Sequence, residues 1–233
     1  MAIMQEQSFI SAGQRIKVEM HASDGAAAPQ AAVIMLHGAD GLNFNSQYRL
    51  GAEALATAGF RVFLVHYLDR TKERRASFST VFRNFPLWAD TVGDALTFVA
   101  DRPDVDRDRI GVVGISLGAA LSLAVASKDR RIIALVDYFG PFPHGAVPPG
   151  AKLPPTLILH GGADPVVPVA NAHAIEALLA QHGASVESKI YPGQGHGFFG
   201  VAERDATERV VVFLRRHLLG EDRVETAPLS AAE

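Results

Sequence analysis

The chain alternates between two kinds of segment, and this alternation limits its fold more than any other feature of the sequence. Short runs rich in β-branched residues are followed by longer runs, rich in alanine and leucine, that have helical spacing. The short runs predict strands at Ala32–His37, Arg61–His66, Arg109–Ile115, Ile132–Tyr138, Thr156–His160 and Val186–Tyr191. The longer runs predict helices at about Gln47–Ala58, Trp88–Arg102, Leu117–Ser127, Ala170–His182 and Ala206–Leu219.

Strands made of nearly continuous apolar residues are typical of a parallel sheet that is covered on both faces. A helix between successive parallel strands forms a right-handed crossover, and such units build a three-layer helix–sheet–helix domain. Two further runs, Gln7–Ile10 and Ile16–His21, flank Ala12-Gly13 and predict an antiparallel hairpin that opens the sheet. The sequence therefore predicts an α/β fold with a mostly parallel central sheet and helices on both faces.

No boundary between two domains is visible in the 233 residues. Because 48% of the residues are hydrophobic, the chain can bury a full core, and α/β chains of this length are often single domains. We therefore expect one domain over residues 1–220. The composition changes after it, and residues 221–233 are expected to form a flexible C-terminal tail.

Charge and cysteine content exclude several classes of function. Lys and Arg total 22 against 25 Asp and Glu, which gives a net charge of -3, so we expect no nucleic-acid and no membrane partner. The absence of cysteine excludes disulfides, thiolate zinc sites and a cysteine nucleophile. No signal-peptide pattern and no run of ~20 apolar residues is present, so a cytoplasmic location is expected.

The segment Gly114-Ile115-Ser116-Leu117-Gly118 matches G-x-S-x-G and lies between a predicted strand and a predicted helix. This context is typical of a nucleophile elbow, a sharp turn that exposes a serine hydroxyl and needs glycines where side chains would clash. The turn also places the N–H of Leu117 at the start of a helix, where it can donate to an oxyanion. The alternative is an ordinary tight connection in which Ser116 only caps the helix.

A serine hydroxyl needs a base that takes its proton, and the base needs an acid that orients it. His196 lies in a glycine-rich loop after the last predicted strand, and Asp164 follows the strand before that one. The order Ser116, Asp164, His196 is the order that accompanies the elbow in α/β-hydrolases. Two alternatives stay open: Asp164 only initiates a turn, or Asp137, near the end of an earlier strand, is the acid.

The segment Leu36-His37-Gly38-Ala39 ends the first core strand, where α/β-hydrolases contribute their second oxyanion donor. We assign that donor to the N–H of Ala39 and give His37 a structural role in the loop. No pair of histidines has H-E-x-x-H spacing, and no glycine-rich nucleotide motif is present. We therefore expect no metal and no cofactor.

Two long connections, residues 67–87 and 140–155, follow strand ends, where ligand specificity resides in open α/β sheets. The first contains five cationic residues and three phenylalanines. One interpretation is that Arg70 pairs with a substrate carboxylate beside Ser116. The other is that Arg70 points into water and contributes little.

From about residue 30 to residue 219, the chain resembles the dienelactone hydrolase family of α/β-hydrolases. The resemblance rests on segments 33–43, 137–140, 161–168 and 191–198, together with the elbow. It implies a compact hydrolase without a large cap, with Ser116, Asp164 and His196 as triad and Leu117 and Ala39 as oxyanion donors.

Two positions depart from the type enzymes of that family. Their nucleophile is cysteine, where this chain has Ser116, and the acidic residue that partners the thiol is replaced by Gly38. Both changes favour a general serine esterase. We expect a serine hydrolase that cleaves small carboxylic esters or lactones through an acyl-serine intermediate. The alternatives are an acyl-peptidase-like hydrolase and a non-catalytic binding protein on the same scaffold.

Overall fold

A computed structural model describes residues 2–25, 29–42 and 46–221. Its strands are β1 Ala2–Ser11, β2 Gln14–Ser23, β3 Gln30–Leu36, β4 Arg61–Val65, β5 Val105–Ile115, β6 Ile132–Tyr138, β7 Thr156–Gly161 and β8 Val186–Tyr191. Its α-helices are α1 Gln47–Thr57, α2 Phe78–Ala100, α3 Leu117–Ala126, α4 Ala170–Gln181 and α5 Val201–Leu214. A 3-10 turn spans Tyr67–Thr71, and a π-helical turn, Arg215–Leu219, extends α5.

The strands form one sheet in the order β1-β2-β4-β3-β5-β6-β7-β8. The pairs β1/β2 and β2/β4 are antiparallel, and all other neighbours are parallel. The predicted mostly parallel sheet is confirmed. The predicted hairpin is also confirmed, and its strands are longer than predicted.

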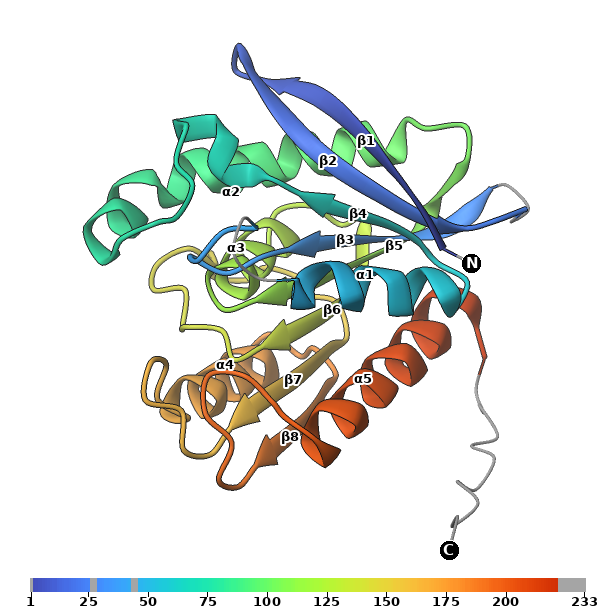
Figure 1. Ribbon diagram of the computed structural model, residues 1–233. Helices are drawn as coiled ribbons and strands as arrows, with labels where there is room; N and C mark the ends of the chain where they lie inside the picture. Colours follow the sequence, from blue (N-terminus) through green and yellow to red (C-terminus); the bar gives the residue numbers. More distant parts are fainter. Residues whose placement is uncertain (1, 26–28, 43–45, 222–233) are drawn as a thin grey trace, which may run out of the picture.

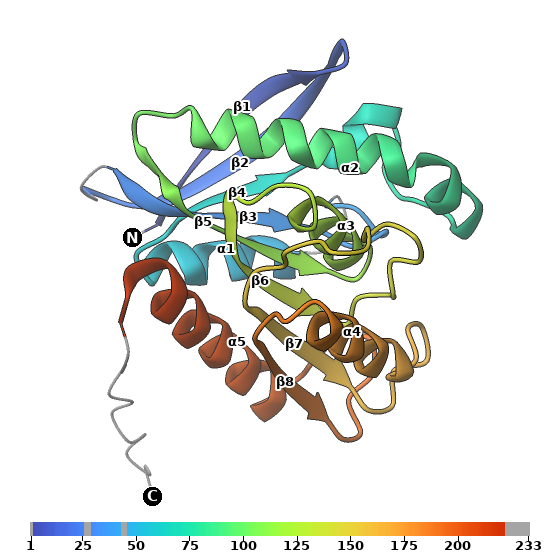
Figure 2. The ribbon, with the colours of Figure 1, turned by 180° about the vertical axis from the view of Figure 1, so that it is seen from behind.

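Helices cover both faces of the sheet. Figure 1 shows α1 and α5 in front of the sheet, and Figure 2 shows α2, α3 and α4 on the opposite face. Successive residues of β3 enter different core clusters, with Ile34 and Leu36 facing α2 and α3 and Val33 and Met35 facing α1 and α5. This double burial explains why the strands are continuous apolar runs. Within the described ranges no large cap is inserted.

The predicted start of the second helix at Trp88 is wrong, because α2 begins ten residues earlier, at Phe78. Ser77 starts the helix with a capping box: its hydroxyl accepts from the N–H of Thr80, whose own hydroxyl accepts from the N–H of Ser77. Pro86 lies inside the helix and is exposed. The loop expected over residues 67–87 therefore consists largely of helical structure.

The C-terminal tail expected at residues 221–233 lies outside the described residues, except for Glu221. Among the helices that the structure describes, none combines the length and the apolar character that crossing a bilayer requires.

We predict that Ser77→Ala lowers the free energy of unfolding by about 1 kcal/mol, because the N–H of Thr80 loses its acceptor. Urea unfolding of the variant and of the matched change Ser79→Ala, two residues further along, measures the effect. Equal stabilities of the two variants would contradict the assignment of Ser77 as the start of α2.

Candidate active site

Ser116 occupies the turn between β5 and α3 in a strained backbone conformation, with φ 55° and ψ −117°. Positive φ is rare for a residue other than glycine and is found where the surroundings enforce it. Here the N–H of Ser116 donates to the carbonyl of Tyr138 over 2.8 Å. A Cβ atom at Gly114 would overlap the backbone of Ala119, and one at Gly118 would overlap the carbonyl of Leu36. The two glycines thus permit the close packing that holds the turn.

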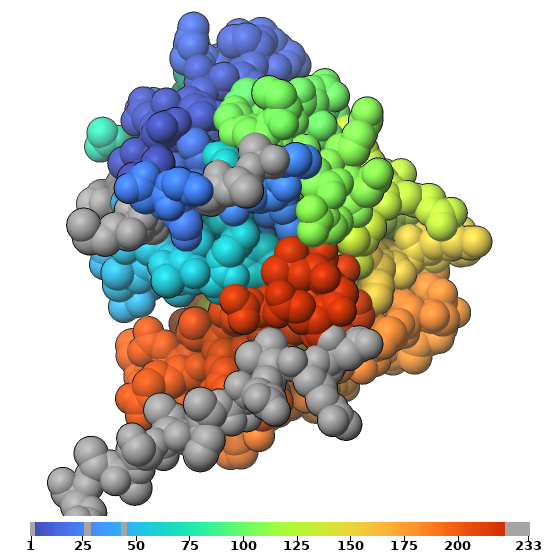
Figure 3. Space-filling model, turned by 90° about the vertical axis from the view of Figure 1, so that its right-hand side faces the viewer, coloured from blue at the N-terminus to red at the C-terminus, as the bar shows by residue number. Residues whose placement is uncertain are grey.

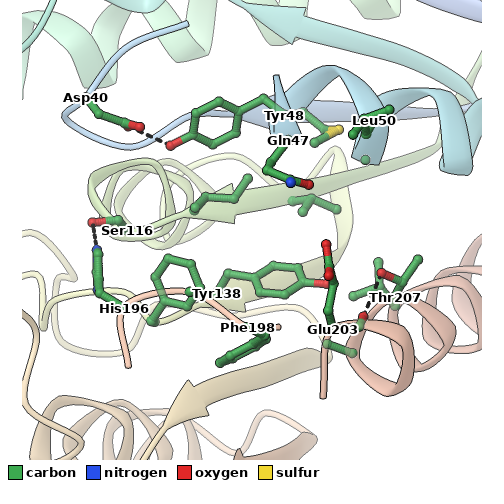
Figure 4. A pocket seen from close by; sticks show the side chains of 18 of the residues that line it. Asp40, Gln47, Tyr48, Leu50, Ser116, Tyr138, His196, Phe198, Glu203 and Thr207 are labelled. Atoms are coloured by element: carbon green, nitrogen blue, oxygen red, sulfur yellow. Dashed lines mark hydrogen bonds between the residues drawn. The ribbon is translucent and has the colours of Figure 1, made fainter. Parts of the chain in front are cut away.

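A continuous chain of hydrogen bonds joins Ser116, His196 and Asp164. The Nε2 atom of His196 lies 3.0 Å from the hydroxyl of Ser116, and its Nδ1 atom lies 2.8 Å from Oδ2 of Asp164. Because a carboxylate only accepts, Nδ1 carries the proton and Nε2 is free to accept from the serine. Figure 4 shows the hydrogen bond between Ser116 and His196. His196 is 80 positions from Ser116 and 32 positions from Asp164 in the sequence, and the fold brings the three side chains together.

The loop after β7 holds Asp164 in its ionised form. Oδ1 of Asp164 accepts hydrogen bonds from the N–H groups of Val166 and Val167 over 2.8 and 2.9 Å. Burial raises the pKa of Asp164, but the hydrogen bonds from His196, Val167 and Val166 outweigh burial and keep the pKa below its ordinary value. The fully buried His160 contacts the carbonyl of Val167 at 2.9 Å and lies 3.6 Å from Oδ2 of Asp164. His160 therefore stabilises the loop that contains Asp164 through its contact with Val167.

Asp137, the competing acid, does not reach His196 in the structure. Its side chain is 1% exposed, and Oδ1 accepts from the N–H of Gly140 over 2.8 Å, whereas Oδ2 has no partner among the described residues. Burial raises the pKa of Asp137 to about 7, and the Gly140 hydrogen bond opposes the rise only in part. An acid that must stay ionised beside an imidazolium is better supplied by Asp164.

The turn that Asp137 supports shapes the wall next to the base. Phe139 has φ 43°, and its N–H donates to the carbonyl of Leu159. Its ring lies 4.6 Å from the imidazole of His196, measured between centroids. The β6 segment therefore packs against the imidazole but donates nothing to it.

Both predicted oxyanion donors lie beside Ser116, since Leu117 starts α3 and Ala39 lines the same cavity as Ser116. Neither N–H donates to another described residue. The carbonyl of Ala39 accepts from the N–H of Ala76 over 2.7 Å, which fixes the loop. A Cβ atom at Gly38 would lie 2.9 Å from both Oδ1 of Asp40 and the hydroxyl of Tyr48 and 3.4 Å from Cβ of Ser116, so a larger residue would have to displace these side chains.

His37 has the structural surroundings that the sequence predicted. Its Nδ1 atom lies 2.7 Å from the carbonyl of Gly38, and its ring stacks on Tyr67 with centroids 4.3 Å apart. Burial lowers the pKa of His37 to about 4, so the ring is neutral near pH 7. The hydroxyl of Tyr67 donates to the carbonyl of His37 over 2.8 Å. His37 thus fixes the loop that precedes Ala39.

Arg70 does not lie with the other candidate residues. It is half-buried in the 3-10 turn, its Nε atom has no partner among the described residues, and it does not line the cavity that contains Ser116. Arg75, from the same basic run, is exposed and does line this cavity. Arg75 lies in the short segment between the 3-10 turn and α2, and the sequence pattern did not predict that α2 begins so close to it.

The cavity beside Ser116 has a volume of about 770 Å³ and passes between α1 and α5. Figure 4 shows Ser116 and His196 at one end and Glu203 and Thr207 at the other. Its size falls within the range of roughly 300–1,000 Å³ that is usual for small-molecule sites. In the described part of the chain, no group of three or more His, Asp or Glu residues is arranged to hold a metal ion.

The chain belongs to the dienelactone hydrolase family, whose family model matches residues 18–216. Over 119 residues it is 32% identical to acyl-protein thioesterase 1 from Gibberella zeae, a match that covers 48% of this chain and 49% of that protein. The chain spans less than half the length of the curated relatives that it matches.

Two solved structures have the same fold. A dienelactone hydrolase-like promiscuous phosphotriesterase from metagenomic libraries superposes with a TM-score of 0.81 at 18% identity, covering 93% of this chain and 98% of the other. The dienelactone hydrolase from Anabaena variabilis superposes with a TM-score of 0.76 at 22% identity, covering 93% and 99%. Both likenesses establish the α/β-hydrolase fold of this chain.

We predict that Asp137→Asn removes one pH dependence of stability. The pKa of Asp137 is about 7 in the folded protein and ~3.9 in an unfolded chain, so between these pH values only the folded state keeps the proton. The free energy of unfolding therefore falls as pH rises through this window, by at most about 1.4 kcal/mol per pH unit, and stays level above it.

Asparagine cannot titrate, so the stability of Asp137→Asn relative to the parent protein should rise from pH 4 to pH 7. Urea unfolding at four pH values measures the difference. Asp90→Asn, at an exposed position of α2, makes the same chemical change at the surface and serves as the control. A difference between Asp137→Asn and the parent that is constant with pH would contradict the raised pKa.

Proposed function

We propose that this protein is a serine hydrolase that cleaves small carboxylic esters or lactones through an acyl-serine intermediate. The observation that carries the proposal is the hydrogen-bonded chain from Asp164 through His196 to Ser116, which ends in a cavity large enough for a substrate. Membership of the dienelactone hydrolase family supports hydrolysis as the reaction. The similarity to acyl-protein thioesterase 1 supports an acyl group as the part of the substrate that is transferred.

In the acylation step, the hydroxyl oxygen of Ser116 attacks the carbonyl carbon while Nε2 of His196 takes the hydroxyl proton. The carbonyl oxygen becomes an oxyanion, which accepts from the N–H groups of Leu117 and Ala39. The ester C–O bond then breaks, and the imidazolium returns its proton to the leaving alkoxide. Asp164 stays ionised and stabilises the imidazolium, which fits its lowered pKa.

In the deacylation step, water takes the place of the alcohol. His196 removes a proton from the water, and the water oxygen attacks the acyl carbon. The second oxyanion that forms accepts hydrogen bonds from the same two N–H groups. Its collapse breaks the bond to Ser116, releases the carboxylic acid and returns the proton to the serine. No group outside the protein and water is needed for this sequence of steps.

We expect Ser116→Ala to lower kcat for p-nitrophenyl acetate by about 10³–10⁶, because the remaining residues cannot supply the nucleophile. Labelling by a fluorophosphonate should disappear in the same variant. Ser127→Ala, at the far end of α3, is the matched control and should keep both properties. If Ser116→Ala retained more than about a tenth of the activity, Ser116 would not be the nucleophile.

Replacing each candidate acid by asparagine shows which of the two orients His196. Asp164→Asn should lower kcat on the order of 10⁴, because the amide favours the wrong tautomer of His196. Asp137→Asn should keep kcat within about tenfold, because Asp137 does not contact the imidazole. Steady-state kinetics on both folded variants provide the comparison, and a reversed order would assign the acid to Asp137.

A further inference from the structure

The cavity that begins at Ser116 continues well past the reacting atoms, as a slot between α1 and α5 whose floor is the sheet. The floor contains Met35 of β3, Val113 of β5 and Tyr138 of β6. Figure 3 views the molecule from the side on which α1, in cyan, lies next to α5, in orange to red. The slot therefore leads away from the oxyanion donors and along the sheet.

Small residues on the two helices leave this space open. Gly51 and Ala54 on α1 line one wall, and Ala206 and Thr207 on α5 line the other. A Cβ atom at Gly51 would meet only Met35, at an ordinary contact distance of 3.5 Å. A larger side chain at position 51 would therefore enter the slot without colliding with the backbone.

The deep surface of the slot is apolar. Met35, Leu55, Val113, Phe198 and Val210 line it, and each is less than a tenth exposed. Hydrocarbon that leaves water for such a surface is stabilised in proportion to its buried area. A charged group there would lose its hydration without a compensating partner.

Charged side chains lie toward the ends of the slot, and they do not favour an anion. Asp40 lies near Ser116, where its Oδ1 accepts from the hydroxyl of Tyr48 over 2.6 Å. Glu203 lies at the opposite end, with the hydroxyl of Tyr138 pointing toward it (Figure 4). Arg75 supplies one cation, and it is exposed. Two carboxylates and an apolar interior make the slot suitable for an uncharged chain.

We propose that the slot between α1 and α5 binds an uncharged hydrocarbon chain of the substrate, so that the protein favours esters with an alkyl chain of several carbons over acetyl and carboxylate-bearing esters. This inference rests on the proposed function and adds the substrate class. The chain belongs either to the acyl or to the alcohol part of the ester, because both meet at the carbon that Ser116 attacks. The exposed side chains of Leu50 and Phe199 form the rim of the slot.

The first test measures kcat/KM for two series of esters, each with chains of two to ten carbons. The acyl series varies the acid of p-nitrophenyl esters, and the alcohol series varies the alcohol of acetate esters. In the series whose chain enters the slot, kcat/KM should rise by up to about fourfold per methylene and then level off. A terminal carboxylate should cancel the gain. Flat profiles in both series would overturn the inference.

Gly51→Leu fills the slot and should lower the ratio of kcat/KM for the eight-carbon ester to that for the acetyl ester by at least tenfold. Gly93→Leu is the matched control. It makes the same change on α2, on the opposite face of the sheet, where a Cβ atom meets nothing within 4 Å. An unchanged ratio in Gly51→Leu, or an equal fall in Gly93→Leu, would contradict the slot as the chain site.

A second test needs no hydrolysis and therefore separates the inference from the proposed function. Titration calorimetry measures binding of octan-1-ol and of octanoate to Ser116→Ala protein, and to the same protein with Gly51→Leu or Gly93→Leu added. Octan-1-ol should bind at least tenfold more tightly than octanoate, with a negative heat-capacity change. Adding Gly51→Leu should abolish the binding of octan-1-ol, whereas adding Gly93→Leu should leave it unchanged. Binding that Gly51→Leu does not weaken would overturn the inference. If the protein with Ser116 intact hydrolysed no ester of either series while this binding to Ser116→Ala protein was observed, the proposed function alone would be overturned.

Discussion

The whole site depends on the close approach of the β5–α3 turn to its neighbouring strands. Ser116 holds a positive φ that costs on the order of 1–3 kcal/mol, and only dense packing around it maintains such a conformation. Gly118 lets the start of α3 lie against the end of β3, and the carbonyl of Tyr138 fixes the N–H of Ser116 from the side of β6. The turn thus brings the ends of β3, β5 and β6 together around one hydroxyl group.

The same edge of the sheet explains why one buried acid is suited to catalysis and the other is not. Asp164 accepts two backbone hydrogen bonds and one from His196, and these three bonds compensate for the hydration that the carboxylate loses on burial. Asp137 accepts one, from Gly140, and leaves its other oxygen without a partner among the described residues. The two carboxylates belong to neighbouring parallel strands, but Asp137 lies near the end of β6 itself, whereas Asp164 lies in the loop after β7, where more backbone N–H groups reach it.

Much of this arrangement could be predicted from the sequence, because its signals are local. Continuous apolar runs separated by helical spacing predicted the parallel sheet, and the glycines around Ser116 predicted the elbow. The start of α2 was missed, because its first turns are largely exposed and begin at a capping box that lacks the usual Glu or Gln. That error affects the basic run, whose member at the cavity is Arg75 whereas Arg70 lies outside it.

The slot between α1 and α5 could not be predicted from any single segment. It is formed by small residues on two helices that are about 150 positions apart in the sequence, and by a floor of three strands. Each of these residues is individually consistent with ordinary core packing. Only the relative placement of the helices leaves the space empty and connects it to Ser116.

The central claim is that Ser116 becomes covalently acylated. Intact-mass spectrometry of protein quenched in acid within milliseconds of mixing with excess p-nitrophenyl acetate tests it most directly. We predict a species heavier by one acetyl group, with the added mass on the peptide that contains Ser116 and absent from protein that carries Ser116→Ala. Rapid hydrolysis with the acetyl group on another residue would contradict the account.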